Sequence, residues 1–167
     1  MDGWLDRLRR EIEETTAGLV EADWMRAPEN AWNCSQIVEH LGRSYGGTAK
    51  MLESRLAEGA SAPLRAARLS ERIARILVVS LGRIPSGRKA PEFVVPHGMP
   101  GPVALKHALS GLERMKTALA SAEQRWGGKE PVGVHFLLGP MTAEQWRKFH
   151  YLHGHHHVLQ MRKRLAG

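Results

Sequence analysis

The sequence predicts an all-α protein, and three observations support this fold class. Apolar residues recur at three- and four-residue steps along five segments, which is the spacing of one face of an α-helix. Proline and glycine gather between these segments, where they favour turns and loops. Residues that can cap a helix stand directly before two of the segments. The five expected helices cover residues 3–22, 34–58, 66–82, 103–125 and 142–164, with almost no strand.

The first two expected helices each carry one apolar stripe. A loop with the sequence Ala-Pro-Glu-Asn at 27–30 separates them. The second helix starts near Asn33 or Ser35, because either side chain can accept a hydrogen bond from the free backbone N–H groups of the first turn. The stripes contain Leu5, Leu8, Ile12 and Leu19 in the first helix, and Ile37, Leu41, Leu52 and Leu56 in the second.

Glycine and proline bound the remaining helices. The third helix ends at Gly82, since glycine readily adopts the conformation that closes a helix. A loop at about 83–101 follows and contains four prolines; loops this long are uncommon and often functional. Pro102 suits the first position of the fourth helix. Thr142 and Gln145 have the spacing of a capping box, so they mark the start of the last helix.

The chain is expected to form a single domain, residues 1–167, with unevenly distributed charge. The net charge is +7, and residues 61–90 hold seven Lys and Arg against Glu71 alone. Such a stretch could attract phosphates or anionic substrates; the alternative is a solvated helix face and loop. It contains no aromatic residue that could stack on a base, so the sequence disfavours a nucleic-acid partner.

The cysteine content and the apolar runs together favour a cytoplasmic protein. Cys34 is the single cysteine, so no internal disulfide can form, which fits a reducing compartment. The charged start, MDGWLDRLRREIEE, is unlike a signal peptide. No apolar run approaches the roughly 20 residues of a membrane span. We therefore expect no membrane partner.

The last expected helix carries five of the nine histidines. His153 and His157 are four residues apart, so they point the same way. One helix uses this spacing to give two imidazoles to one metal ion. His150, three residues before His153, also lies near this face, whereas His155 points away from it. The helix therefore offers two ligands, with His150 as an alternative member of the pair.

Inward-facing histidines need polar partners. A buried, unsatisfied imidazole costs roughly 1–3 kcal/mol. A divalent metal would satisfy several at once, because neutral imidazole is a common ligand. His40 is the best third ligand, since it stands beside the inward Ile37 and Leu41. Spacing alone leaves two interpretations open, a three-histidine metal site and a hydrogen-bonded histidine cluster, with His135 as a loop residue that could approach either.

Three stretches of the chain carry a family resemblance. They are Trp32-Asn-Cys-Ser-Gln-Ile-Val-Glu-His40-Leu, His135-Phe-Leu-Leu-Gly-Pro-Met-Thr-Ala-Glu-Gln-Trp146 and His153-Gly-His-His-His157-Val-Leu-Gln160. With these motifs and the order of its helices, the chain resembles the DinB-like superfamily of metal-binding helical bundles, which includes bacterial thiol S-transferases. It is similar to an uncharacterised subgroup of that superfamily.

The resemblance implies a fold and a ligand set. The fold would be an up-down-down-up four-helix bundle, here with one additional short helix and a long central loop, and often a homodimer. Trp4 and other apolar residues of the outer helices could supply the dimer contact. The ligands would be His40 from the second helix and His153 and His157 from the last, which favours His153 over His150. Zinc, nickel and iron all suit three imidazoles.

The resemblance also implies a chemistry. Three neutral imidazoles would leave the ion its full charge and open positions, so a bound thiol or water would lose its proton more easily. We expect an enzyme that activates a low-molecular-weight thiol for S-transfer to an electrophilic small molecule. The alternatives are a hydrolase that uses metal-bound hydroxide and a non-catalytic metal-binding stress-response module. A hydrolase would need a carboxylate base, and Glu39 points away from the face of His40. The sequence identifies no catalytic or thiol-binding residue.

Overall fold

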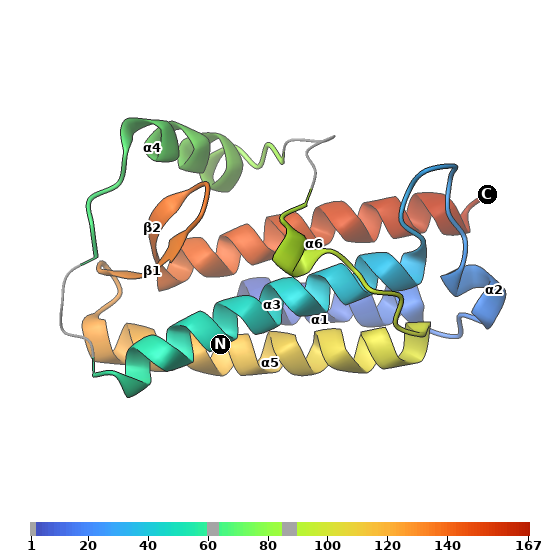
Figure 1. Ribbon diagram of the computed structural model, residues 1–167, viewed down its shortest axis with the longest axis horizontal. Helices are drawn as coiled ribbons and strands as arrows, with labels where there is room; N and C mark the ends of the chain where they lie inside the picture. The colour runs from blue at the N-terminus through green and yellow to red at the C-terminus, as the bar shows by residue number, and fades with distance from the viewer. Residues whose placement is uncertain (1–2, 60–63, 85–89) are drawn as a thin grey trace.

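The computed structural model describes residues 3–59, 64–84 and 90–167, and these are mostly helical. Four long helices lie side by side, while a short helix and a hairpin stand over one end (Figure 1). Among the described residues, no helix has both the length and the apolar character to cross a bilayer. The helices are α1 (Gly3–Thr16), α2 (Glu21–Trp24), α3 (Cys34–Ala57), α4 (Leu69–Arg75), α5 (Gly101–Trp126) and α6 (Ala143–Leu165); the shorter elements are the π-helical turn η1 (Ile76–Ser80), the 3-10 turn η2 (Glu92–Val94) and the antiparallel strands β1 (Pro131–His135) and β2 (Gly139–Thr142).

The core lies between the four long helices and consists of the apolar stripes that the sequence predicts. Helices α3 and α5 pack closely because two glycines face each other between them. A Cβ atom on Gly42 would lie 2.5 Å from Nδ1 of His107, and one on Gly111 would lie 3.2 Å from the carbonyl oxygen of Gly42. Fully buried side chains from all four helices fill the interior: Leu8, Ile12, Ile37, Leu41, Leu52, Met115, Leu119 and Met161.

Both helices that carry the clustered histidines, α3 and α6, start with a capping box; the sequence predicted the box at α6 and, for α3, a cap at Asn33 or Ser35. In α3, the backbone N–H of Gln36 donates to Oδ1 of Asn33 at 2.8 Å, and the N–H of Asn33 donates to Oε1 of Gln36 at 3.0 Å. Of the two predicted caps, Asn33 is therefore the one used. In α6, Thr142 and Gln145 exchange the same pair of bonds. These bonds satisfy first-turn donors and fix where each helix begins.

The predicted first helix, 3–22, is wrong in its second half. Helix α1 ends at Thr16, whose hydroxyl donates to the carbonyl oxygen of Ile12 at 2.8 Å. Gly18 follows with φ of +70°, a conformation that cannot continue a right-handed helix. The chain then re-enters a separate short helix, α2, which buries Trp24. The structure thus has two additional short helices, α2 and α4, where the sequence predicted one.

Two further predictions need correction. The third helix is shorter than 66–82: α4 begins at Leu69, η1 continues it to Ser80, and Gly82 follows with φ of +67°. Residues 131–142 form a hairpin instead of a loop. Its turn uses Gly139 with φ of +70°, and its side chains Val132 and Met141 are buried. Part of the predicted loop at 83–101, residues 85–89, lies outside the described residues.

Polar contacts hold α4 and η1 over this hairpin. The guanidinium of Arg75 donates to the carbonyl oxygens of Leu138 and Pro140. The carboxylate of Glu71 accepts from Arg65 at 2.5 Å and from the backbone N–H of Arg68 at 2.8 Å. Both contacts involve the side of α4 that faces the rest of the protein.

Candidate metal centre

The structure brings the three predicted histidines together. His40 comes from α3, His153 and His157 come from α6, and their ligand nitrogens all lie within 4.8 Å of one another. Nε2 of His153 is 3.2 Å from Nε2 of His40 and 3.2 Å from Nε2 of His157. Two imidazoles on one tetrahedral zinc, at the usual bond length, have their nitrogens about 3.3 Å apart. These three histidines could therefore hold a metal ion.

The hydrogen bonds at the far side of two rings fix which nitrogen carries the proton. Nδ1 of His40 lies 2.9 Å from the carbonyl oxygen of Val94, which can only accept, so Nδ1–H donates. Nδ1 of His157 donates in the same way to Oε1 of Gln160 at 2.9 Å. The amide nitrogen of Gln160 donates to Nε2 of His156 at 3.0 Å. In both His40 and His157, Nε2 is thus a bare lone pair.

This arrangement leaves His153 facing two acceptors. Its Nε2 can carry one proton at most, so it can donate to His40 or to His157 but not to both. The other contact at 3.2 Å then sets two lone pairs against each other. A cation between the three Nε2 atoms would remove this conflict. Nδ1 of His153 is buried and has no hydrogen-bond partner among the described residues, so this ring lacks the acceptor that orients the other two.

Burial keeps the cluster neutral. It lowers the pKa of His40 and, together with the neighbouring His40, lowers the pKa of His157 to about 3. Burial and the adjacent His157 hold the pKa of His153 well below its usual value. Neutral imidazole is the form that binds a metal, so the three rings are ready to ligate at neutral pH.

Aromatic side chains pack against the cluster from α6 and from the segment before α3. Phe149, one turn before His153 in α6, stacks on its ring with centroids 5.7 Å apart and an interplanar angle of 4°. The indole of Trp32, just before α3, lies 5.0 Å from the ring of His40. These rings limit the access of water to the imidazoles and give the site an apolar surround.

Glu39, the neighbour of His40, fixes the loop that supplies the Val94 carbonyl. Its buried carboxylate accepts three backbone N–H bonds, from His97 at 2.7 Å, Gly98 at 2.9 Å and Met99 at 2.8 Å. Burial raises the pKa of Glu39, but these donors outweigh it, so the pKa is lowered overall. The carboxylate is thus committed to the loop, a contact that the sequence did not predict.

The remaining histidines of α6 and the hairpin lie outside the cluster. Nε2 of His150 pairs with the hydroxyl of Thr48 at 3.0 Å. Nδ1 of His135 accepts from the backbone N–H groups of Leu137 and Leu138. His155 contacts Glu11 at 2.7 Å on the side facing α1. Neither His150 nor His135, the two alternatives considered from the sequence, joins the three ligand nitrogens.

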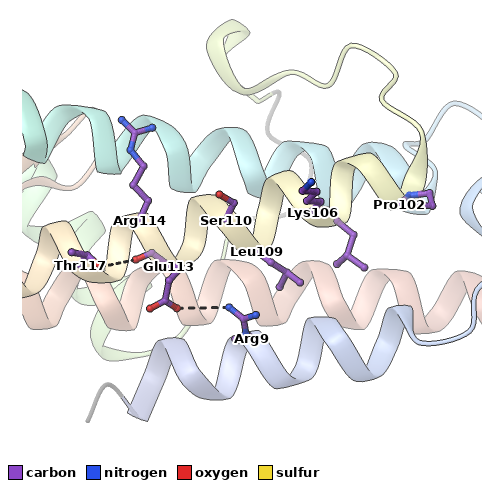
Figure 2. A pocket seen from close by; sticks show the side chains of 9 residues that line it. Arg9, Pro102, Lys106, Leu109, Ser110, Glu113, Arg114 and Thr117 are labelled. Atoms are coloured by element: carbon purple, nitrogen blue, oxygen red, sulfur yellow. Dashed lines mark hydrogen bonds and ion pairs between the residues drawn. The ribbon is translucent and has the colours of Figure 1, made fainter.

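A surface hollow on the outer side of α1 and α5 is separate from the histidines. Figure 2 shows the ion pair of Arg9 with Glu113 in it, at 3.7 Å, and the bond from the Thr117 hydroxyl to the Glu113 carbonyl. Its other lining residues include Lys106 and Arg114. None of the three clustered histidines lines this hollow, so it does not give access to them.

Sequence reasoning missed two groups that orient the cluster. The acceptor for His40 is the backbone carbonyl of Val94, which no side-chain motif reveals. Gln160 was placed on the histidine line, but its contact with both His156 and His157 follows only from the geometry. Its position three residues after His157, on the same helix face, is the signal that could have suggested this role.

Fold and site define a mostly helical protein with a largely buried cluster of three neutral histidines, of which His153 is half-buried, that could hold a metal ion. Over residues 11–164 the chain matches the family described as "Protein of unknown function (DUF1569)", and it belongs to that family. The match includes all three histidines. No curated protein matches the chain significantly, and no solved structure does so either.

Proposed function

We propose that this protein is a metal-dependent enzyme that activates a thiol for S-transfer to an electrophilic small molecule. The observation that carries the proposal is the convergence of three Nε2 atoms, two of them unprotonated, on one point between α3 and α6. The proposal includes a DinB-like, up-down-down-up bundle for the four long helices. It also includes a homodimer and a cytoplasmic location.

His40, His153 and His157 would hold the ion, which we propose to be zinc, nickel or iron. The residues fit such an ion because their facing lone pairs need a cation and because all three rings are neutral. Bound there, a divalent ion would lower the pKa of a ligating thiol, so that the thiol is present as the nucleophilic thiolate at neutral pH.

The surrounding residues favour thiol chemistry over hydrolysis. Val94 and Gln160 accept the Nδ1 protons of His40 and His157 and hold both rings in place. Phe149 packs on His153 and helps to exclude water. A hydrolase would need a carboxylate to take a proton from water, and the carboxylate nearest in sequence, Glu39, is occupied by three backbone donors.

The first experiment measures metal uptake. The purified protein is incubated with zinc, nickel or ferrous ion, dialysed and analysed for metal, and its melting temperature is recorded. We expect about one ion per chain and a higher melting temperature, because the ion binds only the folded protein. His40→Ala, His153→Ala and His157→Ala should each lower both readouts.

Two matched variants serve as controls for metal uptake. His150→Ala and His155→Ala remove imidazoles of the same helix that lie outside the cluster, and both should keep the ion. Loss of metal in His150→Ala but not in His153→Ala would show that α6 binds the ion through His150 in place of His153. If the wild-type protein takes up no divalent ion at neutral pH, the cluster is a hydrogen-bonded one and the proposed function is wrong.

The second experiment tests the reaction. The metal-loaded protein is mixed with a chromogenic electrophile, 1-chloro-2,4-dinitrobenzene, and a panel of low-molecular-weight thiols that includes cysteine and glutathione. We expect at least one thiol to react faster than it does with the metal-free protein or with His153→Ala. Metal uptake without acceleration of any thiol would leave the non-catalytic metal-binding module as the better proposal.

A further inference from the structure

One side of the segment formed by α4 and η1 exposes large apolar side chains. Leu69, Ile73 and Ile76 are 71%, 52% and 55% exposed, and Leu77 and Leu81 are exposed as well. A surface helix of a soluble protein normally turns polar side chains to water. We call these five residues the α4–η1 face.

The α4–η1 face is not a poorly packed part of the core, because the same segment has a second side that packs well. Val78 and Val79 are buried, and Glu71 and Arg75 on that side make the polar contacts with Arg65 and the hairpin. At about 100° per residue, Leu69, Ile73 and Leu77 share one side of the helix and Glu71 lies roughly opposite. The segment is therefore anchored by one side and presents the other outward.

Exposed aromatic side chains lie beside this segment. Phe93 in η2 is 63% exposed, Phe136 in the hairpin turn is 55% exposed, and their ring centroids are 5.9 Å apart. The same turn contains Leu138, whose carbonyl oxygen accepts from Arg75 of α4. The hairpin lies directly against α4 (Figure 1), so Phe136 adds to the apolar surface at that end of the protein.

Arginine borders the α4–η1 face. Arg68, Arg72 and Arg83 are exposed, whereas Glu71, the single acidic residue between 64 and 84, is buried and paired with Arg65. The next acidic residue along the chain, Glu92, is exposed beside Phe93. The surface is thus apolar at its centre and predominantly cationic at its edge.

We propose that the α4–η1 face docks on the surface of an anionic phospholipid bilayer. A helix with Leu and Ile on one side and arginine beside them is typical of segments that lie in the plane of a membrane interface. The apolar side chains would enter the acyl boundary, and Arg68, Arg72 and Arg83 would reach the phosphates, as long cationic side chains do at an interface.

Charge complementarity favours a bilayer over two other occupants. A second copy docked through the same face would bring the arginines of both chains together, with Glu71 already paired in each. A nucleic acid would use the arginines but would leave the five apolar side chains without a role. From the sequence we expected no membrane partner, because no apolar run is long enough to span a bilayer; docking at a surface needs no such run, so this proposal departs from that expectation. The inference does not depend on the metal site.

Sedimentation with vesicles tests the docking surface. The full chain is mixed with large vesicles of phosphatidylcholine, with or without phosphatidylglycerol, and the bound fraction is measured after centrifugation. We expect binding to the anionic vesicles at low salt. Binding should weaken strongly at about 1 M salt, where the screening length falls to about 3 Å.

Two pairs of substitutions separate the apolar contribution from the charged one. Leu69→Ser with Ile73→Ser should weaken vesicle binding about tenfold or more. Its matched control is Val103→Ser with Leu159→Ser, two exposed apolar residues on α5 and α6. Arg68→Gln with Arg72→Gln should weaken binding about 20-fold, whereas Arg10→Gln with Lys50→Gln, exposed cations elsewhere, should change it little.

Three outcomes would overturn the proposal. The first is a wild-type protein that does not bind anionic vesicles at low salt. The second is a Leu69→Ser, Ile73→Ser variant that keeps its melting temperature and binds as the wild type does. The third is a wild-type dimer that this variant converts to a monomer, which would assign the face to a second copy. His153→Ala should bind vesicles normally, so failure of the metal site and failure of the docking surface are distinguishable.

Discussion

The four long helices and the α4–η1 segment differ in how much of their apolar surface is buried. Between the helices, side chains such as Leu8, Ile37 and Leu119 are completely buried, and glycines let α3 and α5 approach closely. The α4–η1 segment packs on the protein by one side only, through the buried Val78 and Val79 and the contacts of Arg75 with the hairpin, while its other side stays exposed.

This difference separates the part that stabilises the fold from the part that presents a surface. Burial of apolar area supplies most of the free energy of folding, and the largest buried side chains lie between the four long helices. A segment anchored by one side can keep the apolar side chains of its other side turned outward. The predictions below test this contrast, from the largest expected effect to the smallest.

Truncating the core should cost far more than truncating the α4–η1 face. Leu119→Ala removes a fully buried side chain and should lower the free energy of unfolding by about 2–5 kcal/mol. Ile73→Ala, on the exposed face, should change it by less than about 0.5 kcal/mol. Urea denaturation of both variants provides the comparison. Equal losses would mean that the α4–η1 face is buried in solution.

Glu39→Gln should loosen the loop that adjoins the metal centre. The amide that replaces the carboxylate offers fewer acceptor sites to three backbone donors, so the variant should lose about 1.5–3 kcal/mol. Hydrogen exchange at His97, Gly98 and Met99 should become faster. Glu53→Gln, an exposed carboxylate that pairs with Arg114, is the control and should affect neither readout. Unchanged exchange in Glu39→Gln would show that these three bonds do not hold the loop.

Acid should destabilise the metal-free protein through the buried histidines. Burial lowers the pKa of His150 to about 3 from a value near 6.5 when unfolded. Between about pH 3 and about pH 6.5 the unfolded chain binds one more proton than the folded chain. The free energy of unfolding is therefore highest above about pH 6.5 and falls as the pH drops. His150 alone should lower the free energy of unfolding by about 2 kcal/mol when the pH is brought to about 5.

The variant His150→Gln isolates this effect. Glutamine can still bond to Thr48 but does not titrate, so the slope of stability against pH between 6 and 5 should flatten by about 1.4 kcal/mol per pH unit. Urea denaturation in the presence of a chelator gives both slopes. His135, whose pKa burial lowers to about 4, should leave some slope in the variant. An unchanged slope would show that His150 is not buried in its neutral form.

Gly154→Ala should destabilise the protein less than the substitutions of Leu119 and Glu39. An added Cβ would lie 2.5 Å from Cδ1 of Leu8 and 2.9 Å from the hydroxyl of Tyr45, so these two buried side chains would have to move. The strain should outweigh the better helix propensity of alanine and leave a net loss of about 1 kcal/mol. Gly47→Ala, where a Cβ meets no atom within 4 Å, should instead stabilise by about 0.5–1 kcal/mol in thermal or urea unfolding. Equal effects of the two substitutions would contradict close packing at Gly154.

The helices were predictable where apolar periodicity and capping residues agree. The start of α3 at Cys34 and the start of α6 at Ala143 match the sequence prediction within one residue. The break after Thr16 was missed because the apolar spacing continues through Leu19, although the backbone at Gly18 turns away. The hairpin was missed because Pro131, Gly133 and Pro140 interrupt strands of four and five residues, which hides any alternation.

The histidine cluster was partly predictable. The four-residue step between His153 and His157 gave one pair, and the family resemblance supported His40. The sequence could not reveal the Val94 carbonyl, because any residue at that position would present the same backbone atom. Nor could it reveal the outward direction of Leu69 and Ile73, since apolar periodicity shows that a helix has an apolar side but not where that side faces.

Because Glu39 and His40 are adjacent in α3, the opening of one loop controls how often the His40 ring can rotate. The two residues follow each other in α3, and both bond to the backbone of the segment from Val94 to Met99. When that segment lifts away, the Nδ1–H of His40 loses its acceptor and the imidazole becomes free to rotate. The lifetime of the closed segment therefore limits how often the ring can turn. The NMR line width of the His40 imidazole would then report the opening rate of a loop more than fifty residues away in the chain.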